Sequence, residues 1–218
     1  MQVVTDNNTN WDELIDHMNE GNPIIIPTDT NYNLACFPDS IEAIDKIFLY
    51  KKRKKDKPLS LFFLDPNDWK KYGDTENKHL LNLIIGKFWP GPLNIIIRKK
   101  GVDYDYMLNN SETIALGCIS NPSWRKFMSN LNGKAIGITS SNISGTVDDT
   151  LVTKEIAFTH MGKNIKYFLE SKQSIKTTKS STIIIIKNDG IEVLREGDIS
   201  TATLIDYLHK EGYSVNGK

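Results

Sequence analysis

Short apolar runs alternate with amphipathic helical segments along the chain, and this alternation constrains the fold more than any other feature. Short runs rich in Ile, Leu and Phe are typical of buried strands. Such runs occupy residues 24–26, 59–64, 93–99, 113–119, 135–139, 181–187 and 191–195. The last two flank Asn188-Asp189-Gly190, and Asp-Gly favours a tight hairpin turn. A hairpin among interleaved strands and helices predicts an α/β protein with a mixed sheet.

Apolar residues at helical spacing predict helices at residues 12–18, 40–53, 77–89, 121–132, 152–161 and 199–212. Ser40 is suited to cap the second of these helices, and Pro90-Gly91-Pro92 stops the third. The chain has no internal repeat and no long linker. We therefore expect a single domain over residues 1–218, with its core at about residues 11–210.

The composition narrows the functional classes. The 218 residues include 27 Lys and Arg and 27 Asp and Glu. Because these charges balance over the whole chain, any site that binds an anion must depend on a local group of cations. The two cysteines have no metal-ligand spacing, and a reducing cytosol is the simplest setting for them. No apolar stretch approaches the roughly 20 residues needed to span a bilayer. These features predict a cytoplasmic protein without a membrane partner.

Four polar segments adjoin the candidate strands. They are residues 28–32, 51–60 and 139–145, and residues 179–182 with Arg195 after the partner strand. Because ligands of α/β proteins bind where strands end in loops, these segments can converge on one site.

The second segment contains a basic run with two interpretations: Lys51, Lys52, Arg53, Lys54, Lys55 and Lys57. Cations are favoured at the C-terminal end of a helix, so the run can be a solvated helix end. Alternatively it binds an anion, because arginine holds phosphate through two hydrogen bonds. The third segment is likewise either a polar turn or an uncharged cradle for a carboxylate, carbonyl or phosphate. No Walker sequence, zinc-ligand spacing or Ser-His-Asp set is present.

Taken together, "PTDTNY", "KKRKKDKPLS", "FWPGPL", "SSNISG" and "SSTIII…VLREGDIS" resemble the YrdC family of threonylcarbamoyl-AMP synthases, in the same order. The resemblance covers about residues 23–200. It implies a twisted mixed sheet flanked by helices around a large central cavity, and no additional C-terminal domain.

The resemblance also implies a nucleotidyltransferase reaction. L-threonine, bicarbonate and ATP would give threonylcarbamoyl-adenylate and pyrophosphate, for modification of tRNA to threonylcarbamoyladenosine. Mg²⁺ would arrive on the nucleotide, with no metal site in the protein. The partners implied beyond the substrates are tRNA or double-stranded RNA and a downstream threonylcarbamoyl transferase.

The resemblance assigns roles to particular residues. Lys51 and Arg53 would be catalytic. The residues implied for threonine are Thr28, Thr30, Tyr32, Arg53 and Ser181. Those implied for the nucleotide are Lys51, Lys57, Pro58, Leu59, Ser60, Thr139, Ser140, Ser141, Asn142, Thr182 and Arg195.

Several positions depart from the family pattern. Asn33-Leu34-Ala35 replaces Gly-Leu-Gly, and Asn33 can preserve a turn because it tolerates left-handed backbone. Gly117 and Asn121 replace an arginine and a histidine, which we expect to weaken anion binding. Asp148-Asp149-Thr150 adds negative charge.

The ending "SNP" resembles YciO-type paralogues, so the alternative is a paralogue that binds nucleotide or double-stranded RNA without efficient synthesis.

Overall fold

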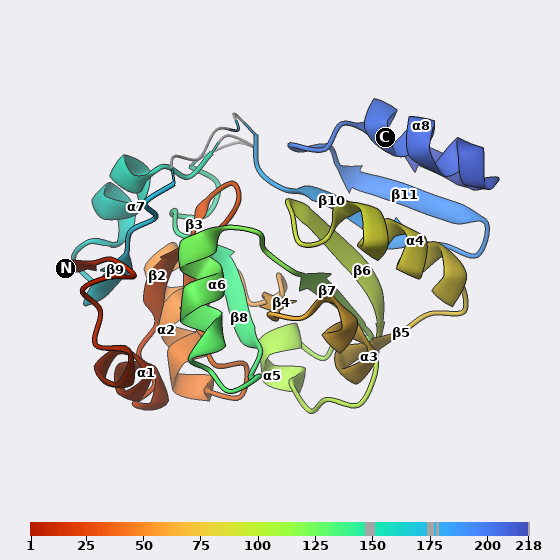
Figure 1. The fold of residues 1–218 in the computed structure, drawn as a ribbon. Helices are drawn as coiled ribbons and strands as arrows, with labels where there is room; N and C mark the ends of the chain where they lie inside the picture. The colour runs from red at the N-terminus through yellow and green to blue at the C-terminus, as the bar shows by residue number, and fades with distance from the viewer. Residues whose placement is uncertain (147–150, 174–176, 178, 218) are drawn as a thin grey trace.

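The computed structural model describes residues 1–146, 151–173, 177 and 179–217. Their strands form one sheet in the order β1-β9-β2-β3-β8-β4-β7-β6-β10-β11-β12, with β5 pairing to β6 (Figure 1). The strands are β1 (Gln2–Val4), β2 (Ile24–Pro27), β3 (Tyr32–Cys36), β4 (Ser60–Phe62), β5 (Gly73–Asp74), β6 (Leu93–Lys99), β7 (Thr113–Gly117), β8 (Ile136–Ser140), β9 (Tyr167–Leu169), β10 (Thr182–Ile186), β11 (Gly190–Arg195) and β12 (Ser214–Gly217).

The sheet is mixed, as the sequence predicts. β2, β3, β8 and β4 pair antiparallel in turn, whereas β4 pairs parallel with β7 and β6 pairs parallel with β10. The predicted hairpin at Asp189-Gly190 is present, because β10 and β11 pair antiparallel with Ile186 opposite Ile191. The α/β fold with a twisted mixed sheet and flanking helices is therefore confirmed.

The helices lie on both faces of the sheet. They are α1 (Trp11–Asn19), α2 (Ile41–Lys51), α3 (Trp69–Tyr72), α4 (Lys78–Phe88), α5 (Asp105–Leu108), α6 (Pro122–Ser129), α7 (Lys154–Met161) and α8 (Thr201–Leu208), with short 3₁₀ turns η1 (Pro66–Asp68) and η2 (His209–Glu211). None of the helices in the described residues is both long and apolar enough to cross a membrane.

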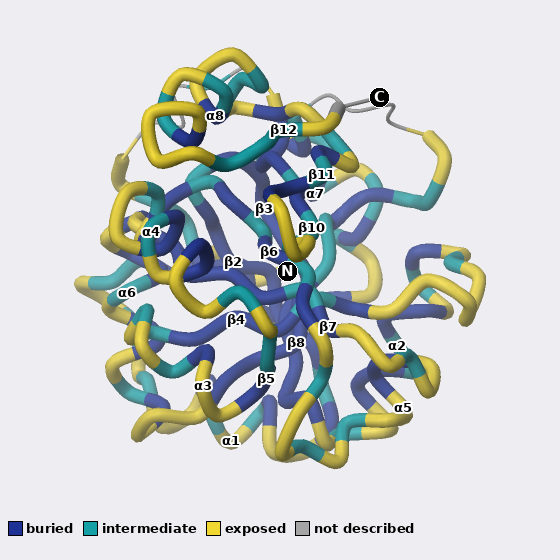
Figure 2. Tube along the Cα trace, turned by 90° about the vertical axis from the view of Figure 1, so that its right-hand side faces the viewer, coloured by how far each residue is buried: buried dark blue, intermediate teal, exposed yellow. Residues whose placement is uncertain are grey.

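Successive side chains of β2 point to opposite faces of the sheet and pack into two different apolar cores. Ile25 packs into the core of α2, α4, α7 and α8, whereas Ile24 and Ile26 pack into the core of α1 and α6. The strands are accordingly buried through the middle of the molecule, while exposed residues lie on the outer helix faces and loops (Figure 2). Because helices cover both faces, polar groups reach the interior mainly where strands end.

Candidate active site

The four polar segments meet at one cavity of about 230 Å³. Among the described residues, its walls contain two arginines, many hydroxyl and amide groups, and no carboxylate. The lining residues are Thr28, Thr30, Asn31, Asn33, Arg53, Pro58, Ser60, Phe62, Asn94, Ile138, Thr139, Ser140, Asn142, Val152, Ser180, Ser181, Ile183 and Arg195. Such a lining can bind anions and neutralise negative charge, but it offers little for acid–base chemistry.

The turn after β2 contributes Thr30 to the cavity and is held in place by hydrogen bonds. Thr28 Oγ1 donates to Asn31 O at 2.8 Å and accepts from Asn31 N at 3.0 Å, so this hydroxyl is used within the turn. Thr30 Oγ1 lies 2.9 Å from Ser181 Oγ, which joins the turn to the segment before β10. Asn31 donates to Ser180 Oγ at 3.1 Å and accepts from Val152 N at 2.8 Å. These bonds bring two predicted threonine-site residues, Thr30 and Ser181, into contact.

Tyr32 lies outside the main cavity, in an adjoining hollow of about 210 Å³ that Thr30 also lines. Its ring packs against Phe168 with centroids 4.6 Å apart, and its hydroxyl accepts from Ser171 N at 3.4 Å. Burial raises the pKa of Tyr32, so its hydroxyl stays protonated at neutral pH. Tyr32 therefore shares a hollow with Thr30 but does not line the cavity with Thr28, Arg53 and Ser181.

Lys51 is the last residue of α2 and is only 1% exposed. Its Nζ donates to Asn142 O at 2.7 Å and also to Ser140 O. Burial, followed by the nearby charge of Arg53, lowers the pKa of Lys51 to about 7. Lys51 is not among the lining residues; it holds the turn that presents Ser140 and Asn142 to the cavity.

The rest of the basic run divides between the cavity and the surface. Arg53 lines the cavity, and its guanidinium donates to Lys57 O and Pro58 O, both at 3.0 Å. Pro58 and Ser60 also line the cavity, whereas Lys57 is exposed and Leu59 is buried in the apolar core. The two interpretations of the run thus apply to different residues: Arg53 faces the cavity and Lys57 faces solvent.

The turn after β8 presents Thr139, Ser140 and Asn142 to the cavity. Ser140 Oγ donates to Asn142 Oδ1 at 2.6 Å, which orients both side chains. Ser141 points away, is fully buried, and donates to Tyr32 O at 2.7 Å. Ser141 therefore braces β3 instead of lining the cavity.

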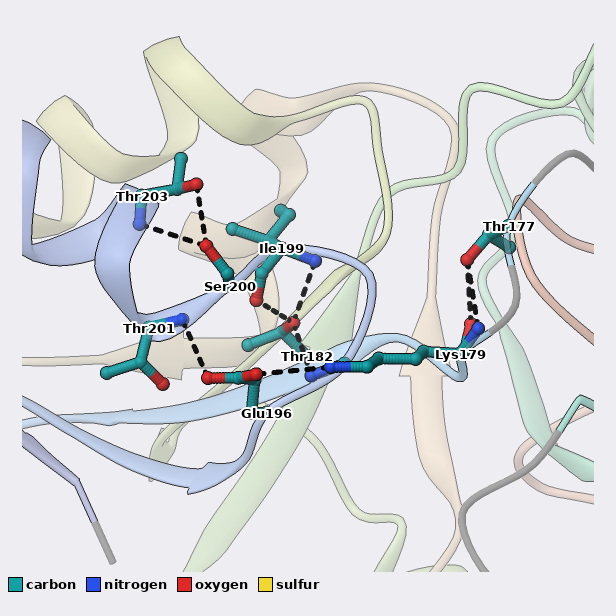
Figure 3. Close-up of polar contacts among 9 residues, drawn as sticks. Thr177, Lys179, Thr182, Glu196, Ile199, Ser200, Thr201 and Thr203 are labelled. Carbon is teal, nitrogen blue, oxygen red and sulfur yellow. Dashed lines mark hydrogen bonds and ion pairs between the residues drawn. The ribbon is translucent and has the colours of Figure 1, made fainter.

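The segment before β10 contributes Ser181, and β11 contributes Arg195. The Arg195 guanidinium donates to Ser181 O at 3.0 and 2.7 Å. Thr182 does not line the cavity; its hydroxyl donates to Ile199 O at 2.6 Å and accepts from Gly197 N and Ile199 N (Figure 3). Thr182 therefore closes the loop between β11 and α8.

Asn33, Phe62 and Asn94 also line the cavity, although their sequence context does not predict them there. Asn33 lies in extended strand β3, so the left-handed turn expected there is wrong. The Oδ1 atoms of Asn33 and Asn94 are buried without a hydrogen-bond donor among the described residues. The only signal in the sequence was the departure from Gly-Leu-Gly at Asn33, because a lone asparagine in a strand has no recognisable pattern.

Gly117 and Asn121 have structural surroundings that account for their small or neutral side chains. A Cβ atom at Gly117 would lie 2.5 Å from ring atoms Cε1 and Cζ of Phe62, so no larger residue fits while that ring stays in place. Asn121 Oδ1 caps α6 by accepting from Ser123 N and Trp124 N, and its Nδ2 donates to Thr28 O at 3.3 Å. Asp148-Asp149-Thr150 lies outside the described residues.

Comparisons with known proteins show which family this chain resembles. Residues 16–197 match the Sua5/YciO/YrdC family model, described as telomere recombination. A protein of Methanocaldococcus jannaschii, named provisionally as a threonylcarbamoyl-AMP synthase, is 34% identical over 82% of this chain and 81% of its own. The threonylcarbamoyl-AMP synthase of Aliivibrio fischeri is 30% identical over 62% of this chain and 74% of its own.

The fold also matches solved structures. The crystal structure of P. abyssi Sua5 complexed with L-threonine superimposes with a TM-score of 0.83 at 17% identity, over 99% of this chain. The present chain spans 63% of that Sua5 chain. The match to the family model over most of the sequence and the 34% identity to the M. jannaschii relative together show the family. The chain belongs to the Sua5/YciO/YrdC family.

Proposed function

We propose that this protein is a threonylcarbamoyl-AMP synthase that acts in the cytoplasm on L-threonine, bicarbonate and MgATP. The observation that supports this most directly is the convergence of the segments that resemble the family motifs on one cavity lined by Arg53 and Arg195. The names of the relatives in M. jannaschii and A. fischeri support the same activity. The threonine bound to P. abyssi Sua5 supports threonine as the amino-acid substrate.

The reaction has two bond-forming steps. The threonine amine attacks the carbonyl carbon of bicarbonate, a C–N bond forms, and a hydroxide group leaves with a proton as water. An oxygen of the resulting carbamate then attacks the α-phosphorus of ATP, and the bond to pyrophosphate breaks. The protein contributes positioning and neutralisation of the phosphate charge, because the described walls of the cavity have arginines but no carboxylate.

The residues divide by role in this proposal. Arg53 and Arg195 neutralise the phosphates and the carboxylate, with Pro58, Ser60, Thr139, Ser140 and Asn142 around the nucleotide. Thr30 and Ser181 bind the threonine, next to the hollow of Tyr32. Lys51 positions the Ser140–Asn142 turn. Thr28 lines the cavity and holds the turn after β2 through its hydrogen bonds with Asn31. Leu59, Ser141 and Thr182 support the walls from behind. In this proposal Mg²⁺ arrives with ATP as part of the substrate, held mainly by the phosphates.

The test is threonine-dependent release of pyrophosphate from ATP and bicarbonate, with L-serine as the competing amino acid. We expect release with threonine, and we expect Arg53→Ala to lower kcat/KM by about 10- to 100-fold, the effect of losing one charged hydrogen bond. Arg98→Ala is the matched control, because Arg98 is an exposed arginine on β6 that pairs with Asp74. Activity of Arg53→Ala equal to that of Arg98→Ala would remove Arg53 from the site.

A folded protein that binds ATP but releases no pyrophosphate would favour the paralogue that binds nucleotide or double-stranded RNA. The affinity for a short RNA duplex, measured at several salt concentrations, then distinguishes an RNA-binding protein from one that binds only the nucleotide. The affinity for RNA should fall steeply as salt rises. Transfer of the product to tRNA through a downstream threonylcarbamoyl transferase is the step that the proposed product requires.

A further inference from the structure

One side of the cavity is uncharged and includes Phe62 and Asn94, which flank Gly117 across the sheet. Phe62 on β4 pairs with Gly117 on β7, and Gly117 pairs with Asn94 on β6. Directly opposite residues in a sheet present their side chains on the same face, about 5 Å apart. Phe62 and Asn94 therefore stand on either side of Gly117. We call these three residues the Phe62 subsite.

Gly117 allows the Phe62 ring to cover the strand. The ring atoms Cε1 and Cζ of Phe62 lie 2.5 Å from the place where a Cβ of residue 117 would be. The ring is held from behind by Trp124, with centroids 5.8 Å apart and planes at 70°. Phe62 is only 3% exposed and still lines the cavity. The result is an apolar surface in a fixed position, with no side chain between Phe62 and Asn94.

Asn94 supplies the polar group of this subsite. Its Oδ1 is buried and accepts no hydrogen bond from the described residues. Its neighbour in register on β10 is Ile183, which is apolar and also lines the cavity. Because the terminal torsion of asparagine is broad, a turn of the amide can bring Oδ1 to the cavity surface at small cost. A buried amide oxygen without a donor is unfavourable, so a ligand that donates to it gains a hydrogen bond that the protein does not provide.

We propose that the Phe62 subsite binds an uncharged part of a substrate, namely an apolar surface with an adjacent N–H or O–H group that donates to Asn94 Oδ1. Asn94 is then a specificity-determining residue. Only a group that carries a hydrogen satisfies Asn94 Oδ1, so the unpaired oxygen favours such a group at this position. This inference rests on the proposed function, in which two groups have the required chemistry: the adenine ring with its exocyclic amine, and the threonine side chain with its methyl and hydroxyl groups.

Calorimetric titration with two ligand pairs tests the proposal and identifies the group. One pair is ATP and purine riboside triphosphate, which lacks the exocyclic amine; the other is L-threonine and L-2-aminobutyrate, which lacks the hydroxyl. We expect the protein to prefer the donor-bearing member of one pair by about tenfold, the size of one hydrogen bond. Asn94→Leu should reduce that ratio to about one, whereas Asn94→Asp, which keeps an acceptor oxygen, should retain it.

Asn67→Leu, at an exposed asparagine, is the matched control and should leave both ratios unchanged. If Asn94→Leu does not fold, Asn94→Ala provides the same comparison. Retention of both ratios in folded Asn94→Leu or Asn94→Ala, which lack the acceptor oxygen, would overturn the subsite while leaving the synthase proposal intact. Binding of neither ATP nor threonine by the unaltered protein would overturn the synthase proposal and the subsite with it.

Discussion

At the scale of single residues, Lys51 has the most unusual environment in the site. Its ammonium is buried and donates to the backbone carbonyls of Ser140 and Asn142, with longer hydrogen bonds to Ser140 Oγ and Asn142 Oδ1. Carbonyl groups solvate a cation only partly, and the charge of Arg53 disfavours a second cation nearby. The pKa of about 7 therefore makes the protonation of Lys51 sensitive to pH near neutrality.

This pKa predicts a pH-dependent stability. Between about pH 7 and the ordinary lysine pKa of 10.5, the unfolded chain binds a proton at Lys51 that the folded protein releases. The free energy of unfolding should therefore rise with pH across that window. Urea unfolding of the unaltered protein and of Lys51→Met from pH 6 to 9 measures this.

We expect the stability of the unaltered protein, relative to Lys51→Met, to increase over this range, because methionine has no charge to bury. Lys52→Met, at the exposed neighbouring lysine, is the control. Parallel pH profiles for the unaltered protein and Lys51→Met would show that Lys51 has no lowered pKa.

At the scale of elements, the loops around the cavity are tied together by capping side chains. Asn121 is both the N-cap of α6 and a donor to Thr28 O, so it joins α6 to the turn after β2. Asp29 in the same turn accepts from Ser120 Oγ at 2.6 Å and from Ser120 N. The position of the turn thus depends on the start of α6.

Asn121→Ala should lower the free energy of unfolding by about 1–2 kcal/mol, the usual cost of losing an N-cap. Asn121→Asp keeps the oxygen that caps α6 but loses the donor to Thr28 O, so it should recover most of the stability. If the turn depends on that donor, both variants should raise the KM for threonine. Equal stability of Asn121→Ala and the unaltered protein would show that Asn121 does not cap α6.

The elements also show how far the sequence could predict the fold and the site. The hairpin at Asp189-Gly190 and the strand at residues 24–26 were predictable, because turn chemistry and apolar runs are local signals. β3 was not predicted, because polar and apolar residues are mixed within it. β9 was not predicted either, because it is only three residues long. The roles of Ser141 and Thr182 in bracing the walls, and of Asn94 in lining the cavity, depend on which strands become neighbours, and that information is not local.

At the scale of the whole molecule, ligand binding and stability should be coupled, because the cavity joins strands from both halves of the chain. A ligand present at 100 times its Kd stabilises a folded protein by about 2.7 kcal/mol. We therefore expect MgATP at that excess to raise the melting temperature by several degrees. Arg53→Ala should lose most of this shift at the same MgATP concentration, and Arg98→Ala should keep it. A full shift in Arg53→Ala would place the nucleotide elsewhere.

The hydrogen bond between Thr30 and Ser181 joins residues that are 151 positions apart. During synthesis, the turn after β2 leaves the ribosome long before β10 exists. The site is therefore incomplete until the last quarter of the chain has been synthesised. A nascent chain interrupted before β10 would have the turn of Thr30 but no Ser181 or Arg195 opposite it. Such a fragment cannot bind substrate in the proposed manner. Contacts between such distant segments form slowly, because the intervening chain must first be closed into a loop.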